Sequence, residues 1–331
     1  MNDTHSNFSL FAIRAPRFSV LFCIVIIFFC RAPKLFSQDA EQRPLGRYAL
    51  RFSSGAGVFL GNTSEIVYWD KKADDYLSCL TWQLMPVFYL SASVEFSPLK
   101  LNNGFYTELN GRAGLPSLNS GVMQDKDWAD PSEKTRLTNF SEHTNRTLGA
   151  ALLSLRTGWS YCAGKYVVLK PYLNFNYDYF SFSAQDGYRR YESEGWEKKN
   201  FYGEVISFTQ MFVIVSPGIK LNFILPASFY FDIFYDLGLV VFYYDEDNHL
   251  LTDVQFKDIT FNGISVNSGI KFSYRPFERF SFDLNFTYNY IGLIRGESIS
   301  RPQNNGKWEE SGIFGAGLSL FEIGLSLTII H

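Results

Sequence analysis

The chain has 331 residues and a formal net charge of −3, from 30 basic and 33 acidic side chains. This near balance excludes the strongly basic surface of a nucleic-acid-binding protein, so we expect no nucleic-acid partner. Aromatic residues are abundant, with 33 Phe and 20 Tyr. After residue 37 no apolar run approaches the length of a transmembrane helix, which excludes a bundle of membrane-spanning helices.

The first 37 residues have the three-part pattern of an export signal. Arg14 and Arg17 precede the apolar run FSVLFCIVIIFFC, and a polar exit that contains Ser37 follows. Because this run is too short to span a bilayer comfortably, it predicts a removable signal peptide over residues 1–37 and a mature domain over 38–331. The mature chain then carries 26 basic and 32 acidic side chains, a net charge of −6.

Two cysteines, Cys79 and Cys162, remain once the signal peptide is removed. One disulfide can form in an exported protein, but two cysteines on strand-like segments are more typical of lone apolar side chains. The cysteine spacing does not fit a zinc site, and we expect no metal and no cofactor.

Strict alternation of apolar and polar residues is the main structural signal. The segment FSFDLNFTYNY, residues 280–290, places every aromatic residue on one face and Ser, Asp, Asn and Thr on the other. A period of two is typical of a strand and not of a helix. YLNFNYDYF, FYFDIFYDLGL and the final FEIGLSLTII repeat it. In an exported chain this pattern predicts a transmembrane β-barrel, with Phe282, Phe286, Phe321 and Leu325 facing membrane lipid.

Ten segments of this kind follow one another along the chain. They cover residues 47–69, 77–97, 99–115, 147–163, 165–183, 201–223, 226–245, 257–274, 277–294 and 309–330. Tight connections such as CAGK and ILPAS alternate with longer polar ones, as periplasmic turns alternate with outer loops. Because many segments exceed the ~10 residues that cross the hydrocarbon, we expect a monomeric ten-stranded antiparallel transmembrane β-barrel extending above the outer membrane.

Two acidic stretches stand among the polar connections. GVMQDKDWAD, residues 121–130, contains Asp125 and Asp127, and DEDNH at 245–249 contains Asp247 and His249. If the strand stays extended, Asp247 and His249 share a face, and a carboxylate beside an imidazole prepares a general base. Solvated loops are the alternative interpretation of both stretches. A metal site formed with Asp130 is a third, but the stretch lacks the Gly and the later Glu of a calcium loop.

In order and spacing, these pieces resemble the omptin family of outer-membrane proteases over essentially the whole mature chain. MQDKDW resembles the family's Asp pair, and DNH resembles its Asp-x-His couple. The resemblance implies an aspartic-type endopeptidase in which Asp125, Asp127, Asp247 and His249 activate a water molecule, with the active site facing the exterior. Glu65 in LGNTSEIVYW and Asp245 match the acids that hold a basic substrate side chain in the family, which implies peptide or protein substrates with basic residues.

Some positions depart from the family pattern. Where the family carries charged side chains that grip lipopolysaccharide, this chain has Phe175, Tyr177 and Tyr179, so we do not expect the family's usual lipopolysaccharide dependence. Asn139 stands where some members carry an acid that favours a basic residue after the cut. Strict alternation from Ile233 upward would also point Asp247 outward, so we predict a β-bulge near residues 242–245.

A catalytically inactive barrel that acts as a porin or adhesin is the rival interpretation, because it accounts equally well for the signal and the strands. The aromatic stretch GYRRYESEGW would suit a protein partner.

Overall fold

The computed structural model describes residues 48–331, except for 71–74, 99–102, 278 and 304–305. The predicted signal peptide and the first residues of the mature domain lie outside the described residues. Within them, strands form nearly all the regular structure, together with one short 3-10 turn at Glu192–Glu194. None of the described helices is long and apolar enough to cross a membrane.

Twelve strands are described, most of them twenty residues or longer. They are β1 (Tyr48–Tyr68), β2 (Tyr76–Pro98), β3 (Gly104–Gly114), β4 (Val122–Asp127), β5 (Asn139–Cys162), β6 (Val167–Tyr191), β7 (Lys199–Ile224), β8 (Phe229–His249), β9 (Val254–Thr260), β10 (Ile264–Phe277), β11 (Phe280–Pro302) and β12 (Glu309–Ile330).

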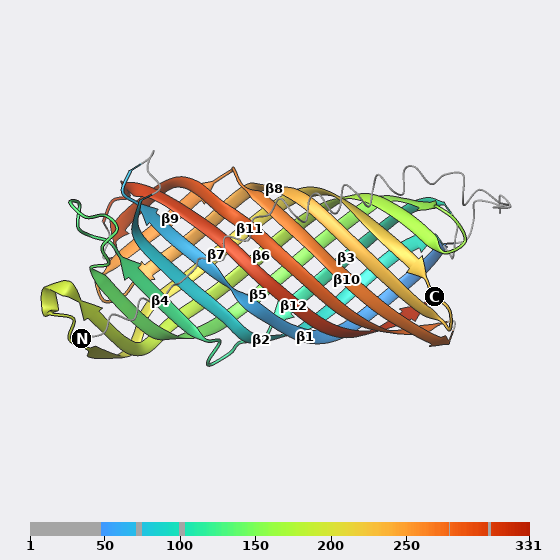
Figure 1. Cartoon of the computed structure of the whole chain (residues 1–331), viewed down its shortest axis with the longest axis horizontal. Helices are drawn as coiled ribbons and strands as arrows, with labels where there is room; N and C mark the ends of the chain where they lie inside the picture. Colours follow the sequence, from blue (N-terminus) through green and yellow to red (C-terminus); the bar gives the residue numbers. More distant parts are fainter. Residues whose placement is uncertain (1–47, 71–74, 99–102, 278, 304–305) are drawn as a thin grey trace, which may run out of the picture.

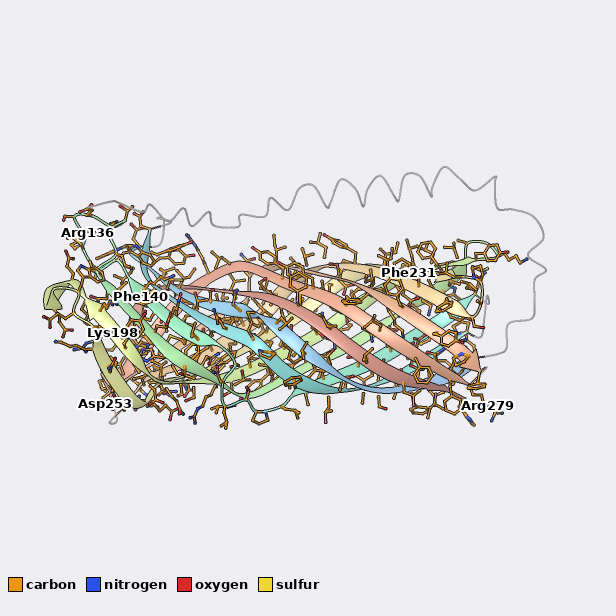
Figure 2. The ribbon with its side chains drawn as sticks, turned by 60° about the horizontal axis from the view of Figure 1, so that its bottom comes forward. Arg136, Phe140, Lys198, Phe231, Asp253 and Arg279 are labelled. Atoms are coloured by element: carbon orange, nitrogen blue, oxygen red, sulfur yellow. The ribbon has the colours of Figure 1, made fainter. Side chains whose placement is uncertain are left out.

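The strands close into an antiparallel ring of ten positions, β1-β2-β3-β5-β6-β7-β8-β10-β11-β12, because β1 pairs with both β2 and β12. Figure 1 shows the resulting elongated barrel, and the prediction of a ten-stranded barrel is confirmed. Tight turns join β5 to β6, β7 to β8 and β10 to β11 at one end, called here the turn end. The opposite, loop end carries Arg136, Lys198 and Asp253 in Figure 2.

The two extra strands occupy positions already in the ring. β4 pairs with β2 and β5, as β3 does nearer the turn end, and β9 pairs with β8 and β11, as β10 does. The prediction of a loop over residues 116–146 was therefore wrong for 122–127 and 139–146, which are strand. Outside the membrane both faces of a strand can be polar, so its sequence looks like that of a loop.

The outer wall is apolar over the half nearer the turn end. Phe282, Phe321 and Leu325 are 57%, 56% and 67% exposed, and Phe286 is half-exposed on the same face. All four point outward as predicted, so this belt is the surface that meets lipid. Cys79 and Cys162 are both free thiols and lie at opposite ends of the barrel, on β2 and at the last residue of β5.

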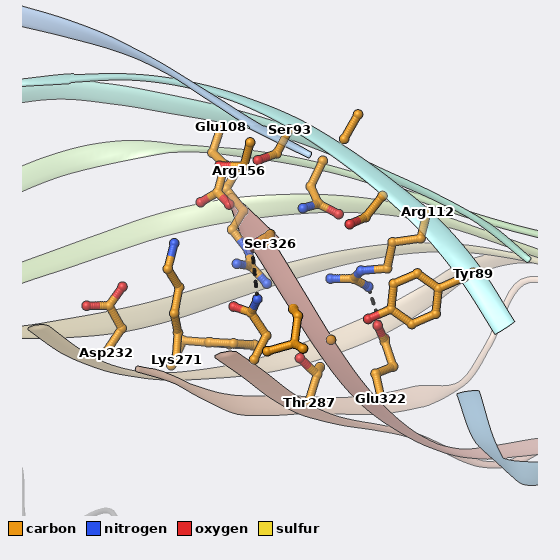
Figure 3. Close-up of a pocket in the computed structure, with 18 of the residues that line it drawn as sticks. Tyr89, Ser93, Glu108, Arg112, Arg156, Asp232, Lys271, Thr287, Glu322 and Ser326 are labelled. Atoms are coloured by element: carbon orange, nitrogen blue, oxygen red, sulfur yellow. Dashed lines mark hydrogen bonds and ion pairs between the residues drawn. The ribbon is translucent and has the colours of Figure 1, made fainter. Parts of the chain in front are cut away.

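Within this half the lumen is lined by charged side chains that pair across it, between strands that are not neighbours in the ring. Arg112 lies 3.0 Å from Glu322, and Lys220 lies 3.2 Å from Glu108. A cavity of about 90 Å³ remains between these pairs (Figure 3). Each of these charges has an oppositely charged partner, so none of the four is left uncompensated inside the barrel.

Between this polar lumen and the loop end, apolar side chains fill the barrel from wall to wall. We call this cluster the plug; its centre is Trp82 on β2, Phe182 on β6 and Phe208 on β7, none of them exposed. The Trp82 and Phe208 rings stack with centroids 5.3 Å apart. Thr63 on β1 donates a hydrogen bond to Gln210 on β7 at 2.8 Å, although four strands separate β1 from β7 in either direction around the ring. The lumen is therefore closed beneath the loop end.

The apolar belt predicts the effect of a charge placed in it. Leu325→Arg should destabilise the folded barrel by about 2–4 kcal/mol, the usual cost of a cation on the lipid face near the bilayer centre. Urea unfolding in lipid vesicles would measure the change. Tyr202→Arg is the control, because Tyr202 is 86% exposed near the first residues of β7 at the loop end, and it should leave the stability nearly unchanged. Equal losses in both variants would contradict the assignment of the belt.

Candidate active site

The Asp125 and Asp127 pair lies on the short strand β4. Asp125 is opposite Leu80 on β2 and Ser141 on β5, and both of these residues are buried on the inner face. Directly opposed residues share a face of the sheet, so Asp125 points toward the barrel axis. Asp127, two residues further along β4, has the same orientation.

Hydrogen bonds from neighbouring strands hold the two carboxylates. Ser78 Oγ donates to Asp125 Oδ1 at 3.3 Å, and Asn139 Nδ2 donates to Asp127 Oδ2 at 3.1 Å. Asn139, singled out in the sequence as a departure from the family, thus fixes one member of the pair. This wall of the site is built by β2, β4 and β5.

Asp245, Asp247 and His249 lie at the loop end of β8, on the far side of the ring. Val213 of β7 pairs with Phe242 and Ile214 pairs with Val240, so Val241 is an extra residue on β8. The bulge reverses the alternation, and above it Asp245 and Asp247 are 0% and 1% exposed. The predicted bulge is confirmed, one residue before the predicted range, and it turns the acids inward.

The imidazole of His249 is bound to the carboxylate of Asp247. Nε2 lies 2.6 Å from Asp247 Oδ2, and the side chain of His249 is 26% exposed. The ring of Phe256 meets the imidazole edge-on, with centroids 5.4 Å apart. The carboxylate and the aromatic ring fix the orientation of the imidazole, while its exposure leaves it accessible to a substrate.

The charges of the two walls act on one another. Burial disfavours the charged imidazole, but the carboxylates of Asp247, Asp125 and Asp127 outweigh burial and raise the pKa of His249 to about 9. Burial, followed by the charge of Asp127, raises the pKa of Asp125 to about 7, against the opposing influence of His249. The Asp pair and the Asp–His couple are therefore close enough for their charges to interact.

Glu65 and Asp245 also approach one another, from β1 and β8. Both are buried, and burial raises the pKa of each carboxyl well above its usual range. The charge of Asp245 adds to the shift of Glu65. Tyr243, buried below them, donates its hydroxyl hydrogen to Asp245. The two acids thus form a buried acidic cluster beside Asp247, which we call the acidic recess.

The sequence analysis missed three residues of this region. Asp258 on β9 is 1% exposed and is the direct partner of Asp245 across β8 and β9. His143 and Ser141 on β5 are both buried, with Nε2 of the imidazole 3.0 Å from the hydroxyl. A hairpin with its turn at 250–253 would have placed Asp258 opposite Asp245, but residues 246–256 were assigned to a polar connection between two strands.

Asp130 does not join Asp125 and Asp127. Its carboxylate accepts hydrogen bonds from Ser132 and forms an ion pair with Arg136 on the loop that follows β4. Among the described residues, no three His, Cys, Asp or Glu side chains are grouped so as to hold a metal ion. The carboxylate of Asp130 thus stabilises the loop on which it lies.

The barrel is closed by the plug, and acids and a histidine lie above it. The protein is therefore a membrane barrel with a candidate site at its loop end. The sequence matches the model of the Omptin family over residues 47–329, and the chain belongs to that family. No curated protein matches the chain.

Among solved structures, the barrel is similar to outer membrane protease OmpT from Escherichia coli. The TM-score is 0.79 at 18% sequence identity, and the match covers 88% of this chain and 100% of that one. A major outer membrane protein from Thermus thermophilus matches with a TM-score of 0.32 at 10% identity, covering 86% and 100% of the two chains. At these identities the similarity to OmpT establishes the fold.

The charge on His249 gives a prediction that needs no substrate. Asp247→Asn removes the largest charge that favours the imidazolium, so burial should then prevail and lower the pKa of His249 by about one unit or more. NMR titration of the His249 ring protons in detergent micelles would measure the shift. Glu309→Gln, at an exposed acid on β12, should leave it unchanged. An unaltered pKa in Asp247→Asn would show that the two side chains do not interact in solution.

Proposed function

We propose that the protein is an outer-membrane endopeptidase that cleaves peptides or proteins next to basic residues. The observation that carries the proposal is the Asp247–His249 couple, which faces Asp125 and Asp127 across the mouth of a plugged barrel. Family membership supports peptide hydrolysis, and the similarity to outer membrane protease OmpT supports an outer-membrane location. The location of the four residues at the loop end supports a site that faces the exterior.

In the proposed reaction, His249 is the general base. A water molecule between His249 and the Asp125–Asp127 pair loses a proton to the imidazole as its oxygen attacks the scissile carbonyl. Asp247 stabilises the imidazolium that forms. Collapse of the tetrahedral intermediate breaks the C–N bond, and His249 returns the proton to the leaving amine, so no covalent acyl-enzyme is formed.

The electrostatics of the site suit this sequence of steps. At neutral pH a pKa of about 7 leaves Asp125 partly protonated, so the pair can both accept from and donate to a water molecule. The raised pKa of His249 keeps the imidazole charged until substrate binds. A substrate cation in the adjacent acidic recess opposes that charge, lowers the pKa of His249 and produces the neutral base.

Glu65 and Asp245 are proposed to hold the basic side chain that precedes the cut. Both are buried, and the hydroxyl of Tyr243 fixes the carboxylate of Asp245. A cation that enters the recess relieves the repulsion between the acids and forms charge-assisted hydrogen bonds with them.

A pore is the weaker alternative, because the stacked Trp82, Phe182 and Phe208 rings fill the lumen. Adhesion to a partner would leave the Asp247–His249 couple and the buried acids Glu65, Asp245 and Asp258 without a role. We further propose that the protein acts as a monomer without a cofactor. Cleavage should not require lipopolysaccharide, since Phe175, Tyr177 and Tyr179 line the outer face of β6.

The catalytic proposal predicts a large loss of activity from either wall. With a quenched peptide that contains arginine, His249→Ala and Asp125→Ala should each lower kcat/KM by about a hundredfold or more. The double variant should lose little further activity, because groups that act on one transition state are not additive. Native protein would be assayed with and without lipopolysaccharide, and Glu309→Ala is the control. Undiminished cleavage by His249→Ala would rule out His249 as the base.

The recess predicts the residue before the cut. Glu65→Gln combined with Asp245→Asn should remove the preference for Arg or Lys, because the charge-assisted hydrogen bonds to the substrate cation are lost. Peptide-library profiling of native and doubly substituted protein would measure the preference. A native protein with no basic preference would refute this assignment, even if it cleaves peptides.

A further inference from the structure

Asp258 occupies a fixed position in the acidic recess. It is opposite Asp245 across the β8–β9 pair and opposite Ser298 across the β9–β11 pair. The hydroxyl of Ser298 donates a hydrogen bond to the Asp258 carboxylate and itself accepts one from Ser311 Oγ at 2.9 Å. Residues of β9, β11 and β12 thus fix one oxygen of the Asp258 carboxylate. Asp258 itself is 1% exposed.

The second oxygen of Asp258 has no hydrogen-bond partner among the described residues. The same is true of Glu65 Oε2 and Asp245 Oδ1. Asp258 is 1% exposed, Glu65 4% and Asp245 0%, so bulk water does not solvate these atoms. A buried polar atom without a partner destabilises the fold, and a charged one does so more strongly. Three such oxygens in one recess indicate a ligand that donates several hydrogen bonds.

That ligand must be a cation. The charges that act most strongly on Glu65 are those of Asp247, Asp245, Asp258 and Asp125, all of them carboxylates. The strongest on Asp245 is that of Asp258, and Asp247 acts on Asp258. Gln210, opposite Asp245 on β7, offers one neutral donor, its Nε2, so the positive charge and the remaining donors that suit the recess come from a molecule that enters it.

We infer that Asp258 is a specificity-determining residue that adds a third carboxylate to the Glu65–Asp245 recess and, with them, binds a guanidinium group. Directly opposed residues such as Asp245 and Asp258 have Cβ atoms about 5 Å apart, so their carboxylates lie side by side. A guanidinium presents five N–H donors in a planar fork that can reach two adjacent carboxylates, with Glu65 approaching from β1. This inference rests on the proposed function, because it assigns the substrate side chain of the same site.

The test compares two peptides that differ only in charge, one with arginine before the cut and one with citrulline, its neutral isostere. The ratio of kcat/KM for the arginine peptide to that for the citrulline peptide should fall about tenfold or more in Asp258→Asn, because a charged hydrogen bond is replaced by a neutral one. Damage to the fold alone would slow both peptides and leave the ratio unchanged.

Controls and a second variant keep the result interpretable. Asp253→Asn, on the exposed turn between β8 and β9, should retain the native ratio. If Asp258→Asn fails to refold, as judged by heat-modifiable migration on electrophoresis, Asp258→Ser provides the same comparison. A folded variant whose ratio equals the native one overturns the inference and leaves the proposed peptidase intact.

A binding measurement separates this inference from the proposed function. Calorimetry would compare agmatine, which carries a guanidinium, with its neutral ureido analogue N-carbamoylputrescine. Native protein should bind agmatine more tightly than the ureido analogue. In Asp258→Asn the ratio of the two dissociation constants should fall about tenfold, as for the peptides. If native protein cleaves neither peptide but shows this dependence, the recess is correct and the peptidase proposal fails. If agmatine and its analogue bind native protein equally, the inference is wrong.

Discussion

The contact between opposite walls of the barrel is the constraint on which the site depends. Trp82 and Phe208 stack across the lumen, and Thr63 on β1 reaches Gln210 on β7. An eight- to ten-stranded ring is narrow enough for side chains to fill. Because the walls meet at this plug, their spacing is fixed just below the site, and charges on β4 and β8 can act on one another without a direct contact.

Loop-end ion pairs brace each wall separately. Arg136 pairs with Asp130 and Glu192, which joins the loop after β4 to the turn after β6. On the other side, Lys257 on β9 pairs with Glu246 on β8 at 3.3 Å. Exposed pairs of this kind contribute little individually. Each of these described pairs lies within one wall and does not bridge the two walls.

Alternation in the sequence was sufficient to predict the ring and its lipid face, since only one of the two facings of each strand places residues such as Phe282 and Leu325 on the outside. The resemblance of short motifs to a family indicated Asp125, Asp127, Asp247 and His249, and their common location follows from the structure. Strand β4 was not predicted, because its residues are polar on both faces. Asp258 was not predicted either, because its partnership with Asp245 depends on the pairing of two polar strands. The bulge at Val241 shows the same limit: alternation required an irregularity on β8, but a bulge has no sequence signal strong enough to fix its position.

The plug also determines where the protons of the site can go. Trp82, Phe182 and Phe208 carry no group that could relay a proton along the lumen, and the charged pairs below them are separated from His249 by this apolar layer. The apolar layer therefore separates His249 and Asp125 from the lumen at the turn end, and the medium at the loop end is the side to which His249 is exposed. The site responds to the acidity on that side alone, and a membrane can hold many copies without becoming more permeable to small solutes.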